Sequence, residues 1–204
     1  EVINASLEVY NVFDITGFAR IVTVHKALRR VSIAGLKQIA KGGVGVLYRL
    51  DDDTVIKVFR PECEQEVLER ERFMAKESFV LGMPTAIPFD IVWVPEEKSY
   101  GLIFEMITAG TVTSAIQKHP ERLEYYAGIF GRVLRQNHTI HVPAGTLPAS
   151  SEEHQEQLDR IAHSFTPEQV ALFRAILAKI PEGDRLLHND YPPKNAMING
   201  EYGQ

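Results

Sequence analysis

Residues 188–195, His-Asn-Asp-Tyr-Pro-Pro-Lys-Asn, are the stretch of this sequence that bears most directly on its fold. They place His188, Asp190 and Asn195 at fixed spacing in a polar loop between two short apolar segments. An aspartate in such a loop can take the proton of an attacking hydroxyl group, and an asparagine carbonyl oxygen suits a hard cation such as Mg²⁺. An Asx turn followed by a Pro-Pro loop would explain the same residues without a ligand.

The segment that leads up to this loop has a helical pattern. Apolar residues recur at helical spacing among good helix formers and predict four helices, over 112–118, 120–138, 151–162 and 167–180, with a loop over 143–148. Short strands are expected only on either side of the polar loop, at 186–187 and 196–198. This half of the chain is therefore predicted to be mostly helical.

The preceding segment has the pattern of an antiparallel sheet. Short β-branched and apolar runs, separated by glycine or aspartate turns, predict five strands, over 36–39, 46–50, 55–59, 89–94 and 100–106. One helix is predicted over 62–79. Strands followed by helices predict an α+β chain of two lobes, one over 33–107 and the other over 108–204.

Three glycines, Gly42, Gly43 and Gly45, lie between the first two predicted strands. Because they have no side chains, backbone N–H groups can approach an anion closely there. A tight hairpin turn explains such glycines without a ligand. The pattern is not a Walker loop, because no Gly-Lys-Ser/Thr follows, and it is not a dinucleotide fingerprint, because a strand rather than a helix comes next.

Lys57 lies inside the third predicted strand, where alternation places it on the opposite face from Ile56 and Val58. Most lysines in such positions face solvent. A functional lysine would bind a phosphate and would need a carboxylate to hold its amine. Among the glutamates of the following helix we predict Glu71, 14 residues further on, as this partner, although a solvated helix face explains the same glutamate.

Taken in order, these pieces resemble the protein-kinase-like fold and, within it, the aminoglycoside phosphotransferase and choline kinase family of small-molecule kinases. The resemblance covers about residues 33–204 and implies ATP and Mg²⁺ as cofactors. It assigns nucleotide binding to the glycine loop, Gly42, Gly43 and Gly45, and to the strand lysine Lys57 with its glutamate Glu71. It also assigns adenine binding to the backbone of the strand that links the lobes, Glu105, Met106 and Ile107.

The same resemblance assigns the catalytic loop. The family has His-Gly-Asp, a short segment and Asn, which His188, Asp190 and Asn195 match. By resemblance Asp190 deprotonates the acceptor hydroxyl, His188 braces the loop and Asn195 binds Mg²⁺. The loop departs from the family at two positions, because Asn189 stands where glycine is usual and Lys194 stands where a glycine commonly precedes the metal-binding asparagine.

The resemblance implies transfer of the γ-phosphate of ATP to a hydroxyl group of a small molecule. In the family the next strand carries an aspartate that holds the metal, and this sequence ends at Gln204 before reaching it, so we expect a lobe truncated at its C-terminus. The alternative is a catalytically inactive, nucleotide-binding or regulatory module that acts through protein partners. A protein kinase is disfavoured, because the loop lacks the arginine and lysine usual there.

The first 32 residues lie outside this resemblance. A helix is predicted over 6–18 and a strand over 19–25, and together they resemble the last helix and strand of an anti-sigma-factor antagonist (STAS) domain. An extension that packs on the small lobe explains them equally well. We expect a regulatory protein partner to bind through this segment.

Composition and charge exclude several classes of protein. The 22 Lys and Arg against 27 Asp and Glu give a net charge of −5, so no overall basic field is present for nucleic acid. No apolar run reaches the length of a membrane span, so we expect no membrane partner. A single cysteine, Cys63, cannot form an intrachain disulfide, and we expect a cytoplasmic protein.

Overall fold

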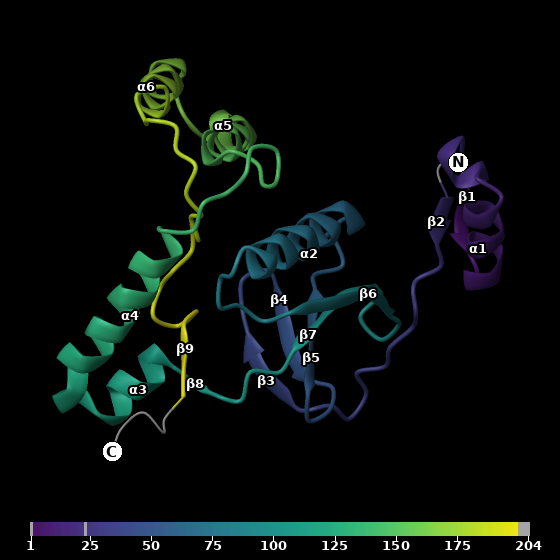
Figure 1. The fold of residues 1–204 in the computed structure, drawn as a ribbon, viewed down its shortest axis with the longest axis horizontal. Coiled ribbons are helices and arrows are strands. Elements are labelled where there is room, and N and C mark those ends of the chain that lie inside the picture. Colours follow the sequence, from purple (N-terminus) through teal and green to yellow (C-terminus); the bar gives the residue numbers. More distant parts are fainter. Residues whose placement is uncertain (1, 23, 200–204) are drawn as a thin grey trace. The chain divides into compact units, whose positions relative to one another are not determined.

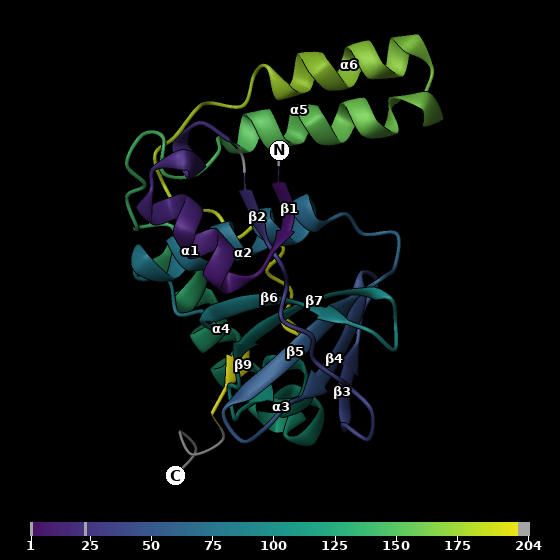
Figure 2. The ribbon, with the colours of Figure 1, turned by 90° about the vertical axis from the view of Figure 1, so that its right-hand side faces the viewer.

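The computed structural model describes residues 2–22 and 24–199. The chain divides into two units, one formed by residues 1–75 and 86–106 and the other by residues 76–85 and 107–204 (Figures 1 and 2). The helix α2, Gln65–Val80, contributes residues to both units. Each unit has its own arrangement of elements.

A five-stranded antiparallel sheet forms the centre of the first unit, with the strand order β3-β4-β5-β7-β6. The strands are β3 Gln38–Lys41, β4 Gly45–Arg49, β5 Thr54–Phe59, β6 Pro88–Val94 and β7 Ser99–Glu105. The predicted antiparallel sheet of five strands is confirmed, as is the mixed α+β class.

The central strand β5 separates two apolar layers because successive side chains of a strand point to opposite faces. Ile56 and Val58 belong to one buried cluster, together with residues of β6, β7 and the segment before β3. Phe59 belongs to a second cluster, which includes Leu68 of α2 and Leu102 of β7. Alternation therefore places Lys57 on the same side of the sheet as α2.

The second unit is largely helical. Its helices are α3 Val112–Lys118, α4 Leu123–Asn137, α5 Ser150–Ile161 and α6 Pro167–Leu177, and α5 and α6 lie side by side (Figures 1 and 2). The short strand β8, Gly110–Thr111, pairs antiparallel with β9, Met197–Ile198. This pair ties the segment after the 188–195 loop to the start of α3.

The strand predicted at 186–187 is wrong. The neighbouring Arg185 forms one isolated bridge with His141, and the N–H of Leu186 donates to the carbonyl of Ile140 at 3.0 Å. Leu186 is 4% exposed, so its apolar character reflects burial in the second unit rather than membership of a sheet.

At the N-terminus, β1 Val2–Ala5 and β2 Val24–Lys26 are parallel and are joined by α1, Leu7–Ile15. The strand predicted over 19–25 is wrong for most of its length. Gly17 ends the helix with φ of 76°, and Phe18–Arg20 then form a turn of 3₁₀ helix. β-branched residues favour a strand, but a strand forms only at Val24–Lys26, where the chain pairs with β1.

None of the helices among the described residues has the length and hydropathy of a membrane span.

The sheet contains one glycine whose replacement has a definite stability cost. A Cβ on Gly101 of β7 would lie 2.6 Å from Cδ1 of Ile56, which is fully buried. We expect Gly101→Ala to lower the free energy of unfolding by about 1–3 kcal/mol, because the core has no room for the added methyl. Gly131→Ala is the matched control, since no atom lies within 4 Å of its Cβ position in α4 and alanine favours a helix. Urea unfolding measures the free energy of unfolding of both variants. A change in the same direction for both would contradict this account.

Candidate functional site

Lys57 and Glu71 form the best-defined polar contact of the first unit. The Lys57 Nζ donates to both carboxylate oxygens of Glu71, at 2.7 and 2.9 Å. Alternation along β5 turns the lysine toward α2, and Glu71 lies on that helix. Both side chains are partly buried, with 24% and 34% of their surface exposed. The contact fixes the position of an ammonium group that retains a third N–H donor.

The surroundings of Lys57 restrict its side chain further. Its Nζ lies 4.6 Å from the centre of the Phe59 ring, which belongs to the same face of β5. Of the neighbouring glutamates, Glu69 instead accepts a hydrogen bond from Gln65 at 2.8 Å. The structure therefore brings Lys57 to Glu71, the partner that the sequence analysis selected.

The three glycines between β3 and β4 differ in their surroundings. A Cβ on Gly45 would lie 2.3 Å from the carbonyl oxygen of Val58, so pairing of β4 with β5 requires glycine there. A Cβ on Gly43 would meet no atom within 4 Å, and one on Gly42 would meet only the carbonyl oxygen of Gly45, at 3.8 Å. The N–H of Gly42 donates to that same carbonyl oxygen at 2.9 Å, so it is not available to a ligand. Packing thus explains Gly45, the turn uses the N–H of Gly42, and the backbone of Gly43 is open to the approach of a ligand.

The end of β7 contains the residues expected to bind adenine. The N–H of Glu105 donates to Ile87 at 2.9 Å, and the N–H of Met106 donates to Asp53 at 2.7 Å. These two N–H groups are therefore not available to a nucleotide base. Among the described residues, the N–H of Ile107 has no hydrogen-bond partner, so it is the donor that remains at this segment.

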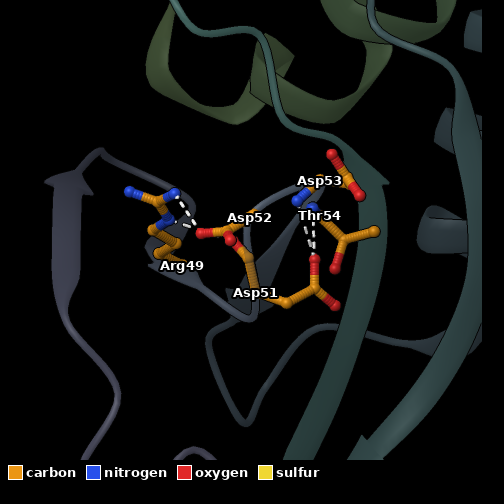
Figure 3. Close-up of polar contacts among 5 residues, drawn as sticks. All are labelled: Arg49, Asp51, Asp52, Asp53 and Thr54. Atoms are coloured by element: carbon orange, nitrogen blue, oxygen red, sulfur yellow. Dashed lines mark hydrogen bonds and ion pairs between the residues drawn. The ribbon is translucent and has the colours of Figure 1, made fainter.

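The aspartates of the β4–β5 turn hold that turn together (Figure 3). Asp51 Oδ1 accepts from the N–H groups of Asp53 at 2.9 Å and Thr54 at 2.7 Å, and Arg49 pairs with Asp52 at 2.7 Å. Hydrogen bonds from Thr54 and from the backbone of Asp53 lower the pKa of Asp51. In the part of the chain that the structure describes, no group of three or more His, Cys, Asp or Glu side chains is arranged to hold a metal ion. These carboxylates accordingly have a structural role.

In the second unit, Asp190 and Asn195 lie in contact. The Asn195 Nδ2 donates to Asp190 Oδ2 at 2.9 Å and also lies 3.3 Å from the Asp190 carbonyl oxygen. A turn supports this arrangement, because the N–H of Asn195 donates to Pro192 at 2.9 Å. With the amide nitrogen directed at Asp190, the amide oxygen of Asn195 is left as an acceptor, which is the atom that a hard cation prefers.

Asn189 adopts the left-handed conformation, with φ of 58°. This explains the departure from glycine at this position, because asparagine tolerates that region better than other residues with side chains. The turn brings the N–H of Asp190 to the carbonyl oxygen of His188 at 2.7 Å. His188 is half-buried, and it lies next to the exposed Asp190.

Tyr191 anchors the loop to α4. Its ring stacks on Phe130 with centres 4.4 Å apart and planes inclined by 11°, and its hydroxyl lies 3.5 Å from the Phe130 carbonyl oxygen. The ring of His188 is 5.3 Å from that of Tyr191. Burial raises the pKa of the Tyr191 phenol. No role is predicted for Tyr191 from the sequence, where the available signal is an aromatic residue directly after the aspartate of a polar loop.

A protein-family model described as "Phosphotransferase enzyme family" (APH) matches residues 35–204. The chain belongs to this phosphotransferase family. The match includes both residue pairs described above and leaves the N-terminal β1-α1-β2 segment outside, so the resemblance of that segment to a STAS domain gains no support. A comparison with curated proteins found no match.

Membership of the phosphotransferase family gives a chemical context for the two pairs. A partly buried ammonium held by a carboxylate suits the binding of phosphate oxygens, and an aspartate beside an asparagine amide suits proton transfer next to a cation. Each pair is formed within one unit, by residues that the structure describes.

The conformation of Asn189 predicts a graded series of stabilities. We expect Asn189→Gly to unfold with a free energy equal to or above that of the parent chain, and Asn189→Ala to be less stable. Asn189→Val should have the lowest free energy of unfolding, about 1–2 kcal/mol below that of the parent chain, because a β-branched residue is strained at positive φ. Chemical denaturation checks the order. Equal stability of the valine and glycine variants would show that the loop does not require this conformation.

Proposed function

We propose that this chain is an ATP-dependent phosphotransferase that transfers the γ-phosphate of ATP to a hydroxyl group of a small molecule. Family membership supports the reaction type. The single observation that carries the proposal is the contact of Lys57 Nζ with both carboxylate oxygens of Glu71. An exposed ion pair adds little to stability and holds its side chains loosely, whereas a partly buried pair presents its remaining N–H donor in a defined direction.

The residues of the first unit fit the donor nucleotide. Lys57 would bind phosphate oxygens, and Glu71 would keep its ammonium in place. The open backbone at Gly43 would approach the phosphates. ATP supplies the phosphoryl group, and Mg²⁺ neutralises the charge on its phosphates.

The catalytic loop of the second unit fits the remaining tasks. The Asp190 carboxylate would orient the acceptor hydroxyl and take its proton, since one of its oxygens is occupied by Asn195 and the other is left over. The Asn195 amide oxygen would bind Mg²⁺, which needs few protein ligands when phosphate oxygens and water complete its shell. His188 and Tyr191 would hold the loop in this shape.

The first experiment tests nucleotide binding by calorimetric titration of the 204-residue chain with ATP and Mg²⁺. We expect micromolar to sub-millimolar affinity in the parent chain and a loss of at least about tenfold in Lys57→Ala, because a charge-assisted hydrogen bond to phosphate disappears. Lys37→Ala is the control, since Lys37 is an exposed lysine of the same unit. Equal affinity of the two variants would contradict the role of Lys57.

The second experiment tests Asp190. We expect Asp190→Asn to reduce release of ADP by about 10²- to 10⁴-fold, with water, choline or an aminoglycoside as acceptor, because the amide cannot accept the proton. Its affinity for ATP and Mg²⁺ should stay within about threefold of the parent value. Asp14→Asn, an exposed aspartate outside the family match, is the control. A variant at Asp190 that kept most of its turnover would rule out the assignment of Asp190 as the base.

A further inference from the structure

The second unit contains a cavity of about 370 Å³ that none of the assigned residues lines. Its walls come from α3, the beginning of α4 and the strands β8 and β9. Small-molecule sites commonly have volumes of about 300–1,000 Å³, so this cavity is large enough for a compact metabolite. It lies within one unit, and its shape is set by contacts of that unit alone.

The charge of the lining is positive, although the net charge of the chain is −5. Lys118, His119 and Arg122 all border the cavity, and none of the described residues that line it is acidic. His119 contacts Glu121 at 3.2 Å. Among the described residues, neither Lys118 nor Arg122 takes part in an ion pair, so two cationic groups beside the cavity lack an anionic partner. Such an arrangement favours an anion over a cation or a neutral molecule.

The cation and the aromatic rings of this cavity are arranged together. The Arg122 guanidinium lies 4.6 Å from the centre of the Tyr125 ring and 5.7 Å from that of Tyr126. Stacking on rings restricts the guanidinium while leaving its N–H groups free to form paired hydrogen bonds with phosphate. The rings of Tyr125 and Tyr126, with Ile198, add apolar surface that suits a ring or carbon skeleton.

We propose that this cavity is a binding site for a small phosphorylated organic molecule, with Arg122 and Lys118 on the phosphate and the tyrosine rings on its carbon skeleton. The site goes beyond the proposed phosphoryl transfer, because it includes none of the residues assigned to ATP, Mg²⁺ or proton transfer. Arginine provides the directional contact with the phosphate, and lysine provides a second positive charge.

Phenyl phosphate is a suitable probe because it combines a dianionic group with a flat ring, and phenol is the matched ligand without the phosphate. In a ¹H–¹⁵N NMR titration of the 204-residue chain, we expect saturable shifts of the backbone amides of Lys118, Arg122 and Ile198 with phenyl phosphate only. Equal shifts with phenol would overturn the proposal, and so would shifts confined to other parts of the chain. A titration that does not saturate up to 10 mM would also overturn it, because the binding free energy would then be weaker than about 3 kcal/mol.

Variants separate this site from nonspecific binding of anions. The double substitution Lys118→Gln with Arg122→Gln should weaken binding by at least about tenfold, whereas Lys179→Gln, beyond the end of α6 at Leu177, should leave it unchanged. Arg122→Lys is measured as well, in case the double variant fails to fold. It keeps the positive charge, so its affinity for phenyl phosphate should be within about tenfold of that of the parent chain. Equal loss in Lys179→Gln, or no loss in the double variant, would contradict the site.

One further variant separates this inference from the proposed function. Lys57→Ala should weaken the binding of ATP by at least about tenfold and leave the phenyl phosphate titration unchanged, because Lys57 does not border the cavity. If phenyl phosphate binding were also lost in Lys57→Ala, the probe would be bound at the nucleotide site and the proposal of a second site would fail. If ATP binding were absent from the parent chain while the probe still bound, only the proposed function would fail.

Discussion

The partly buried ammonium of Lys57 links the central sheet of the first unit to α2. It stands in the middle of the central strand β5, between two residues that belong to the apolar core, so its own side chain must emerge on the face that α2 covers. A cation in such surroundings needs a carboxylate, because desolvation without a partner is costly. Glu71 provides both of its oxygens, and the position of α2 on the sheet is thereby linked to the position of one charged atom.

The loop over 188–195 depends on a different kind of constraint. It begins at a residue with positive φ, Asn189, and its end is fixed by the side chain of Asn195 on Asp190. These bonds are local, and by themselves they would leave the loop free to move as a whole. The stacking of Tyr191 on Phe130 connects the loop to α4, a helix that is 15 residues long. Rigid attachment of a short loop to a helix is what positioning of a reactive carboxylate requires.

The sequence alone allowed much of the fold to be predicted, for reasons that particular elements make clear. Period-two alternation marked β5, and helical spacing marked α4, because both elements have one face in a core. Prediction failed where a segment lacks a partner strand, as at 186–187 and 19–22, and where a two-residue strand such as β8 exists only through its pairing. Contacts such as that of Tyr191 with Phe130 join residues 61 positions apart and leave no periodic signal.

The candidate site was easier to predict than these contacts, since its decisive interactions are short in sequence. Lys57 and Glu71 are 14 residues apart, and Asp190 and Asn195 are five apart, so spacing within one strand–helix connection and one loop is enough to suggest both pairs. Each pair is also complete within its own unit. Local interactions alone therefore form both pairs, and each depends on a single connection or loop of its own unit.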